Sequence, residues 1–511
     1  MSIRDKISSQ RIQQVSTIAL LSLALFQLLT VLVRFNFVYT DIDQCLMWYG
    51  TSEFRQLHFH MPRFFGQNYG SMLEALVAAP MIFFPINVAV PFASSLLFLL
   101  PFIFLISFGN SNSDKLALVA FLLCVLPVEY LMMANMPRDF VSGLAVTSLA
   151  IPLLLSPKRW AKITVGFLCI LGWSFNHNAA LLGAMLSAFA AFNENGAPNW
   201  RWALYLGLGY FFGFGAHFLI SSFGYLHPEF IVHHAWNFHY AWKQVLQGWT
   251  NLDRHFRWLT PIFHGQGTFY LLLMISFPVY FYAKRQFKLV MTSLAGLVVT
   301  FASFGILKVH DGYDSIFLSH ERMFLALPVM LAFLLTQMRL KKSWILPVLA
   351  ILSACFVIRT QVSLSETIAA HVDPARKDNK NFLHITHQQV KDDCDMLRQA
   401  VNSNQSQAVI IYPTKRIDGL QAYACSSIDK DIIYVDAGYD RKTWDMRALD
   451  QPAYTSVILV SDHPHLDSLV SHLSMDVHLQ PTNESSIYAL TGEPFNPLDV
   501  MRELKFTVSN H

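Results

Sequence analysis

The sequence contains little charge and none of the common nucleotide-binding motifs. Charged residues make up 14% of its 511 residues, about half the share found in soluble proteins. It holds no G-x-G-x-x-G segment and no P-loop, so nucleotide binding is not indicated. Its six cysteines show no C-x-x-C spacing, and no internal repeat or low-complexity segment is present. These shortages exclude a soluble multidomain enzyme, a coiled coil and a disordered chain.

Apolar residues are abundant, and charge is divided unevenly along the chain. Hydrophobic residues reach 53%, and the mean hydropathy is +0.37. The last 151 residues hold 13 of the 37 Lys and Arg but 20 of the 34 Asp and Glu, so an apolar basic body precedes an acidic tail. Because the basic residues are dispersed among apolar segments, we expect no nucleic-acid partner.

The apolar runs predict a polytopic α-helical membrane protein with about eleven transmembrane helices. The expected spans lie at 15–38, 88–109, 114–133, 138–156, 161–175, 178–193, 199–222, 268–285, 287–305, 320–338 and 342–360. Residues 161–193 are too long for one helix, and polar residues interrupt their centre. We therefore predict two short helices that turn at His177.

The distribution of loop charge predicts the orientation. With the N-terminus in the cytoplasm, every short loop on that side carries Lys or Arg, as the positive-inside rule requires. Treating 161–193 as one span would place the later basic loops outside. The first apolar run lacks an A-x-A-like cleavage site, so we expect it to remain as an anchor. Most carboxylates of the membrane part then lie on the outer face.

Composition divides the chain into a transmembrane domain, residues 1–360, and a soluble extracytoplasmic α/β domain, residues 361–511. The first contains a large outer loop at 39–87 and a second at 223–267. In the tail, β-rich runs at 408–413, 431–437, 456–462 and 486–492 predict three or four strands. Cys394 and Cys425 can form a disulfide there or remain two free core thiols.

The first outer loop contains the most informative residues. Asp41 and Asp43 directly follow an apolar span, in the segment YTDIDQCLMWYG. Desolvation and mutual repulsion at the membrane surface can tune such a pair to provide a general base. The alternative is an ordinary solvated start of a loop.

The loop, with its ending FFGQNYGSMLEALVAAP, resembles that of bacterial GT-C glycosyltransferases related to protein O-mannosyltransferases and to the lipid A aminoarabinose transferase. Three further segments are similar to that superfamily: Arg138-Asp139 opening the fourth span, GWSFNHNAALL at 172–182, and ERMFLALP at 321–328. The resemblance covers residues 1–360 in outline. It implies the GT-C fold and a sugar donor carried on a polyprenyl phosphate.

The resemblance also implies roles for individual residues. Asp43 matches the catalytic base. Because Gln44 stands where relatives often have Glu, Asp41 could be its partner or its replacement. Asp139 matches the second acidic residue, and Arg322 would hold the donor phosphate. The remaining candidates would bind the donor phosphate (Lys308, His310, His320) or line the cavity (Gln67, Asn68, Tyr69, Glu74, His177).

Each role has a structural alternative. Arg322 could mark a membrane interface, Asp139 could cap the fourth helix, and His177 could satisfy the backbone at the helix break. The histidines of the 223–267 loop, His227, His233, His234 and His239, suggest zinc but lack a convincing ligand set. The tryptophans of that loop, Trp236, Trp242, Trp249 and Trp258, favour an amphipathic helix on the membrane surface.

The function predicted from the sequence is an inverting glycosyltransferase. It would move a sugar from a polyprenyl-phosphate donor to a hydroxyl of a glycan, lipid or protein, at the periplasmic face of a bacterial inner membrane. No cofactor is required, and a divalent cation is compatible. Two rivals stay open: a flippase or transporter of lipid-linked glycans, and a polysaccharide polymerase or ligase using diphosphate-linked glycans. The sequence identifies neither sugar nor acceptor.

Overall fold

A computed structural model describes residues 3–108, 113–226, 239–338, 344–373 and 384–503, apart from 413, 415, 416, 418, 438–442, 452, 472, 474 and 475. The chain divides into two compact units. The first comprises Met1–Asn36, Ser94–Ile220 and Asn237–Phe382, and the second Phe37–Ala93, Ser221–Trp236 and Leu383–His511. Most of the expected first outer loop therefore belongs to the same unit as the C-terminal tail. The boundary that composition places at residue 360 falls inside a helix, α16.

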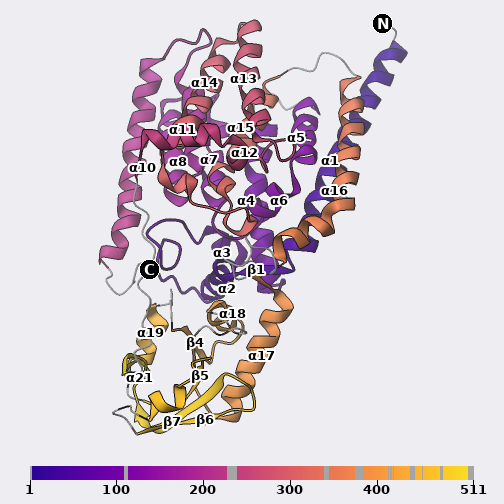
Figure 1. Cartoon of the computed structure of the whole chain (residues 1–511). Helices are drawn as coiled ribbons and strands as arrows, with labels where there is room; N and C mark the ends of the chain where they lie inside the picture. The colour runs from indigo at the N-terminus through magenta and orange to yellow at the C-terminus, as the bar shows by residue number, and fades with distance from the viewer. Residues whose placement is uncertain are drawn as a thin grey trace. The chain divides into compact units, whose positions relative to one another are not determined.

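The first unit is helical. Its long helices are α1 (Ile3–Val31), which continues as a π-helix over Leu32–Asn36, α4 (Ile86–Ser107), α10 (Trp200–Leu226) and α16 (Ile345–Val372). The start of α4 and the end of α10 belong to the second unit. Its shorter helices are α5 (Ser113–Val125), α6 (Val128–Ala134), α7 (Ser142–Ser148), α8 (Arg159–Phe175), α9 (Ala179–Ala191), α11 (Trp242–Thr250), α12 (Leu252–Phe256), α13 (Gly267–Ala283), α14 (Phe287–Ser303) and α15 (Leu327–Thr336). Helices α1 and α16 lie side by side (Figure 1) and share a core with α5.

Four described helices, α1, α4, α10 and α16, are long and apolar enough to cross a membrane. Helices α5 and α6 form a fifth candidate, but they are bent by 101° at their junction. The expectation of one continuous helix over 114–133 is therefore corrected. Pro127 lies at the bend, where it restricts the residue before it and provides no backbone N–H for α5.

Two other expected spans contain shorter helices than their apolar runs suggested. In 138–156, α7 is followed by a 3₁₀ turn at Ile151–Leu153 that contains a proline. In 320–338, His320–Phe324 is a 3₁₀ helix, and the ten-residue α15 begins only at Leu327. A run of apolar residues predicts that a segment is buried. It does not predict the length of a helix, because buried loops can be as apolar as buried helices.

The predicted break within 161–193 is confirmed. Helix α8 ends at Phe175 and α9 begins at Ala179, with His177 between them. Near this break α7 and α8 pack through glycines: an added Cβ on Gly143 would lie 2.6 Å from the carbonyl oxygen of Gly172. Small residues at such crossings let helix backbones approach closely in membrane proteins.

The second unit contains a mixed five-stranded sheet in the order β4-β3-β5-β7-β6. Its strands are β3 (Ala408–Ile411), β4 (Ile433–Asp436), β5 (Tyr454–Val460), β6 (Val477–Pro481) and β7 (Ile487–Phe495). Strand β3 pairs in parallel with β4 and β5, and β7 pairs antiparallel with β5 and β6. The four predicted strands are confirmed. Strand β6 escaped prediction because it is a largely exposed edge strand that ends in proline.

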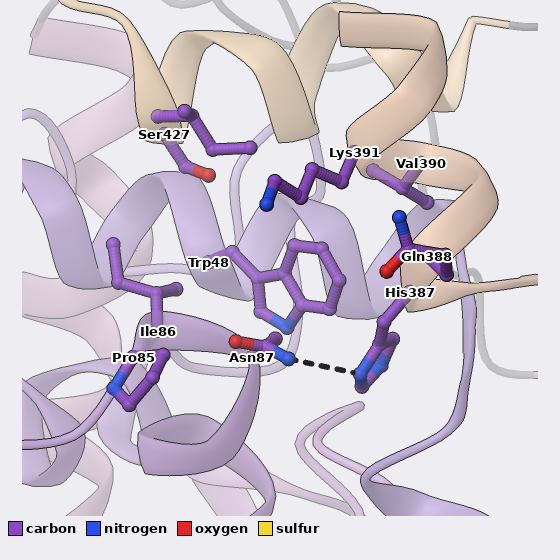
Figure 2. A pocket seen from close by; sticks show the side chains of 10 residues that line it. Trp48, Pro85, Ile86, Asn87, His387, Gln388, Val390, Lys391 and Ser427 are labelled. Atoms are coloured by element: carbon purple, nitrogen blue, oxygen red, sulfur yellow. Dashed lines mark hydrogen bonds between the residues drawn. The ribbon is translucent and has the colours of Figure 1, made fainter. Parts of the chain in front are cut away.

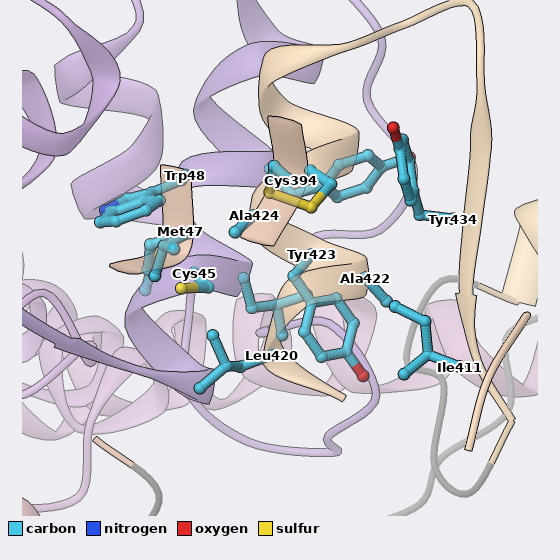
Figure 3. Packing of buried hydrophobic residues seen from close by; sticks show 14 of the residues in the cluster. Cys45, Met47, Trp48, Cys394, Ile411, Leu420, Ala422, Tyr423, Ala424 and Tyr434 are labelled. Carbon is cyan, nitrogen blue, oxygen red and sulfur yellow. A yellow bond between two sulfur atoms is a disulfide. The ribbon is translucent and has the colours of Figure 1, made fainter. Parts of the chain in front are cut away.

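The expected first outer loop packs on this tail. Its helices are α2 (Ile42–Arg55) and α3 (Leu73–Ala78), and those of the tail are α17 (His387–Ser403), α18 (Leu420–Ile428), α19 (Thr443–Leu449), α20 (Leu466–Val470) and α21 (Pro497–Glu503). Strand β1 (Tyr39–Asp41) pairs antiparallel with β2 (His384–Thr386). One core combines side chains of α2, α17, α18 and the sheet, including Met47, Leu420 and Tyr423 (Figure 3).

Cys394 and Cys425 form a disulfide that joins α17 to α18 within this core. The structure thus decides between the two alternatives that the sequence left open. The bond closes a loop with a sequence separation of 31 residues, and cross-links of this length reduce the conformational entropy of the unfolded chain.

Glu53 of α2 forms the main ionic contact between the loop and the tail. Its carboxylate lies 2.5 Å from the ammonium of Lys430 and 2.9 Å from His60 Nε2. Trp444 stacks on His60 at 3.8 Å between ring centroids and donates a hydrogen bond to the hydroxyl of Tyr49. Burial alone would raise the pKa of Glu53, but the hydrogen bonds and charges of His60 and Lys430 outweigh it and lower the pKa to about 2.

Replacing both bonded cysteines by serine should lower the free energy of unfolding of the second unit by about 3 kcal/mol. The physical reason is the larger conformational freedom of the unfolded chain without the cross-link. Thermal unfolding of the purified double variant measures the effect. The exposed free cysteine Cys355 provides the control, since Cys355→Ser should leave the unfolding temperature unchanged. Equal unfolding temperatures for wild type and the double variant would contradict the prediction.

The depressed pKa of Glu53 predicts loss of stability in acid. The ion pair stabilises the folded state fully above the ordinary glutamate pKa, near 4.5, and this contribution disappears as the pH falls towards 2. Unfolding measured at several pH values between 6 and 3 should show this decline in wild type. Glu53→Gln should be less stable at pH 6 and show a smaller decline, whereas the exposed Asp467→Asn should behave as wild type.

Candidate functional site

The two carboxylates of the first loop occupy different positions at the start of α2. Asp41 is buried and is the N-cap of the helix, where its side chain accepts a hydrogen bond from the backbone N–H of Gln44 at 3.1 Å. Asp43 lies in the first turn and is half-buried. Because capping requires a side-chain oxygen directed at the helix backbone, Asp41 has a structural task, and Asp43 is the more accessible carboxylate of the pair.

The expected cavity-lining residues of this loop differ in burial. Glu74 is fully buried in the first turn of α3, and Gln67 is 9% exposed. Tyr69 is half-buried and Asn68 exposed. Helix α3 packs on α2 two turns beyond Asp43, where the hydroxyl of Thr51 donates to the carbonyl of Ala75 at 3.3 Å. These residues and the acidic pair all belong to the second unit.

Asp139 belongs to the first unit and has a strained backbone. Its φ is +66°, in the left-handed region that residues with a Cβ seldom adopt, and its side chain is 2% exposed. Such strain persists only where the surroundings enforce it, and it often marks functional positions. The residue at the N-cap of α7 is Val141. Asp139 therefore does not cap this helix, and that alternative reading is wrong.

Two asparagines at the break between α8 and α9 connect segments that are distant in sequence. Asn176 donates from Nδ2 to the carbonyl of Asp139 at 2.9 Å. Asn178 donates from Nδ2 to the carbonyl of Phe140 at 2.8 Å and to that of Arg322 at 3.4 Å. The backbone of the Asp139 segment and that of the Arg322 segment are thereby held beside the break. His177, between the asparagines, packs edge-on against Trp173 at 5.2 Å.

The buried Arg322 and the half-buried Lys308 contribute positive charge in the same unit. Arg322 is 7% exposed and donates to the backbone carbonyl of Asp311 at 2.7 Å. Its guanidinium lies 3.8 Å from the Asp311 carboxylate. Burial, together with the charge of Arg322, lowers the pKa of Lys308 to about 8, although Asp311 opposes this shift. The two cations are thus close enough to repel one another.

Three histidines, His255, His310 and His320, lie close to one another in the same unit. The Nε2–H of His310 donates a hydrogen bond to the carbonyl oxygen of Phe304 at 2.8 Å. The ring of His255 lies 5.1 Å from that of His310 and 5.8 Å from that of His320, centroid to centroid. Neither ring nitrogen of the buried His320 has a hydrogen-bond partner among the described residues. Burial, reinforced by nearby arginines, lowers the pKa of His320 to about 4, so this ring is neutral at neutral pH.

The structure adds three residues that the sequence analysis did not select. Glu321 is fully buried; it accepts from the hydroxyl of Ser319 and lies 3.4 Å from Arg257 Nε. Burial raises its pKa to about 7. Arg257 also pairs with Asp314 at 2.8 Å, and His255 joins the histidine group. The sequence signal that could have found two of them is the run Arg254-His255-Phe256-Arg257 within residues 223–267.

The expected outer loop at 223–267 does not form one continuous amphipathic helix, because α11 and α12 are separate helices. Trp242 and Trp249 are exposed on α11, but Trp258 lies beyond α12, is buried, and contacts the guanidinium of Arg257 at 4.3 Å. His239 is exposed; His227, His233, His234 and Trp236 lie outside the described residues. Among the residues described, no group of three or more His, Cys, Asp or Glu side chains could hold a metal ion.

The twelve predicted site residues fall equally into the two units. The structure brings the Asp139, His177, Lys308, His310, His320 and Arg322 segments together in the first unit. The second unit contains Asp41, Asp43, Gln67, Asn68, Tyr69 and Glu74. The first group contributes two cations, three imidazoles and the Asp139 carboxylate, and the second contributes the carboxylates of Asp41, Asp43 and Glu74. No protein-family model matches the chain, and no curated protein matches its sequence.

The low pKa of Lys308 predicts an unusually reactive amine. Amine-reactive labelling followed over pH by mass spectrometry should give a midpoint near pH 8 for Lys308, compared with about 10.4 for an ordinary lysine. Arg322→Gln should raise this midpoint because it removes the repelling charge. A wild-type midpoint near 10, or no change in the variant, would contradict the assigned cause.

Proposed function

We propose that the chain is an inverting GT-C glycosyltransferase that uses a polyprenyl-phosphate-linked sugar. The observation that carries the proposal is that the two carboxylates of the first loop have different surroundings. Asp41 is engaged as a helix cap, whereas Asp43 is half-buried in the first turn of α2. A carboxylate near the membrane and partly shielded from water is suited to accept a proton from a hydroxyl.

The positive charges of Arg322 and Lys308 in the first unit support the proposal that the sugar donor is an anion. Arg322 is buried and Lys308 half-buried, and both lie near the Asp311 carboxylate; positive charge that is partly shielded from water favours an anionic ligand. A phosphate would relieve their repulsion, and the guanidinium fork of Arg322 suits phosphate geometry. The low pKa of Lys308 is the measurable sign of its burial and of the nearby charge of Arg322.

In the proposed reaction, the acceptor hydroxyl attacks the anomeric carbon of the sugar while Asp43 takes its proton. The bond between the anomeric carbon and the phosphate oxygen breaks, and polyprenyl phosphate leaves with the electron pair. Arg322 and Lys308 stabilise the charge that develops on the leaving phosphate. A single displacement inverts the anomeric configuration. The step requires no cofactor and is compatible with a divalent cation; its acceptor is a glycan, lipid or protein.

The proposal includes a GT-C arrangement with about eleven spans. Five of these spans would be the four long apolar helices and the bent pair α5 and α6. The other six would contain α7, α8, α9, α13, α14 and α15. A 17-residue helix such as α13 measures about 25 Å, which is slightly less than the hydrocarbon thickness. The N-terminus would be cytoplasmic and the second unit periplasmic, in a bacterial inner membrane. The disulfide supports an oxidising compartment for that unit.

The test compares Asp43→Asn with Asp41→Asn in transfer from a panel of radiolabelled polyprenyl-monophosphate sugars to cell-envelope fractions. Asp43→Asn should lower transfer by at least a hundredfold because the base is lost. Asp41→Asn should keep most activity because asparagine caps helices about as well as aspartate.

Both variants must show wild-type unfolding temperatures for this comparison to count. Full transfer by Asp43→Asn would contradict the assigned base. Transfer only from diphosphate-linked glycans would favour a polymerase or ligase. Movement of a lipid-linked glycan across the membrane without transfer would favour a carrier.

A further inference from the structure

A pocket of about 310 Å³ lies within the second unit. Its walls come from α2, the start of α4, the first turns of α17 and the end of α18. The lining includes Trp48, Asn87, His387, Gln388 and Lys391, together with the apolar side chains of Pro85, Ile86, Val390 and Ile428 (Figure 2). No role described above uses these residues.

Trp48 gives the pocket a buried hydrogen-bond donor. The indole nitrogen of Trp48 is buried without a hydrogen-bond partner in the described part of the chain, although the side chain is only 3% exposed. In Figure 2 it points to the side of the pocket where Asn87 and His387 meet. An N–H buried in this way costs free energy unless a ligand or water accepts from it.

Lys391 contributes a positive charge. Its side chain is exposed on α17, and Figure 2 shows its ammonium end directed into the pocket. The neighbouring acids of its helix have partners of their own: Asp392 accepts from the lining residue Gln388 at 2.7 Å, and the buried Asp393 accepts from Gln421 at 3.0 Å. Among the described lining residues, Lys391 is thus the side chain that brings full charge to the pocket.

The N-terminal end of α17 also favours a negatively charged ligand. Residues His387, Gln388, Val390 and Lys391 form the first turns of α17, a helix of 17 residues whose N-cap is Thr386. The N-terminus of such a helix carries partial positive charge and favours anions. His387 shares a hydrogen bond with the Asn87 amide at 3.2 Å, which leaves the amide oxygen of Asn87 available as an acceptor for hydroxyl groups.

The pocket adjoins a strongly apolar surface. Ile82, Phe83 and Phe84 are 66%, 92% and 47% exposed, and they directly precede the lining residues Pro85 and Ile86. Helix α4, which begins at Ile86, is long and apolar enough to span a membrane. Exposed aromatic residues at the end of such a helix are typical of the membrane interface, where lipid phosphates lie.

We infer that this pocket binds a phosphate ester that also carries hydroxyl groups, held by the Lys391 ammonium, the Trp48 indole N–H and the N-terminus of α17. The headgroup of an anionic phospholipid and a soluble phosphate ester share this chemistry. The site is independent of the proposed transfer reaction and of the Arg322 group.

The experiment measures binding to the purified full-length chain in a phosphate-free detergent by isothermal titration calorimetry. The probes are glycerol 3-phosphate, short-chain dihexanoyl phosphatidylglycerol, and dihexanoylglycerol as a lipid without phosphate. Lys391→Gln should weaken phosphate binding about tenfold, since a charge-assisted hydrogen bond is lost. Trp48→Phe should weaken it about fivefold. Arg502→Gln, which removes an exposed charge from the same unit, should change it less than twofold.

The outcomes separate the sources of phosphate. Binding of glycerol 3-phosphate as tight as that of the lipid supports a soluble ester, and much tighter binding of the lipid supports a headgroup. The inference is overturned if neither phosphate probe binds better than dihexanoylglycerol, or if Lys391→Gln binds as wild type does. Should Trp48→Phe unfold, Lys391→Gln decides alone, because its side chain is exposed and its loss leaves the core intact.

Discussion

The first unit depends on how backbone polar groups are satisfied where its apolar helices break. Asn176 and Asn178 donate to three carbonyls of two other segments, those of Asp139, Phe140 and Arg322. A buried carbonyl without a partner costs about 1–3 kcal/mol, and a membrane supplies no water to replace one. These side chains therefore fix the strained Asp139 segment and the Arg322 segment beside one another. Arg322, one of the two cations of the candidate site, belongs to a segment held in this way.

The second unit shows the same dependence on contacts between distant segments. Helix α2, which carries Asp43, packs on α18 and is connected to the tail by Glu53 and Lys430, 377 positions apart in sequence. The tail is therefore part of the structure that holds the acidic loop in place. Mutations in α17 or α18 would disturb α2 without touching its carboxylates, because the core of the two segments is shared.

Local features of the sequence predicted much of the fold. The polar interruption at His177 located the helix break, alternating β-rich runs located four of the five tail strands, and apolar composition indicated membrane-spanning helices. Prediction was poorer for helix length. Pro127 bends one expected span, and 3₁₀ turns shorten two others, since hydropathy measures burial and not backbone geometry. The number of spans and their arrangement stay part of the proposal.

For the candidate site, the sequence by itself determined which residue types were available: two carboxylates after the first apolar run, an Arg-led segment at 321–328 and a broken helix with polar residues. It could not determine their tasks. Only the tertiary structure made Asp41 a helix cap, placed Lys308 close enough to Arg322 for their charges to repel, added Arg257 and Glu321, and joined Glu53 to Lys430. The physical reason is that hydrogen bonding and ion pairing act over a few ångströms, and folding alone decides which distant residues come that close.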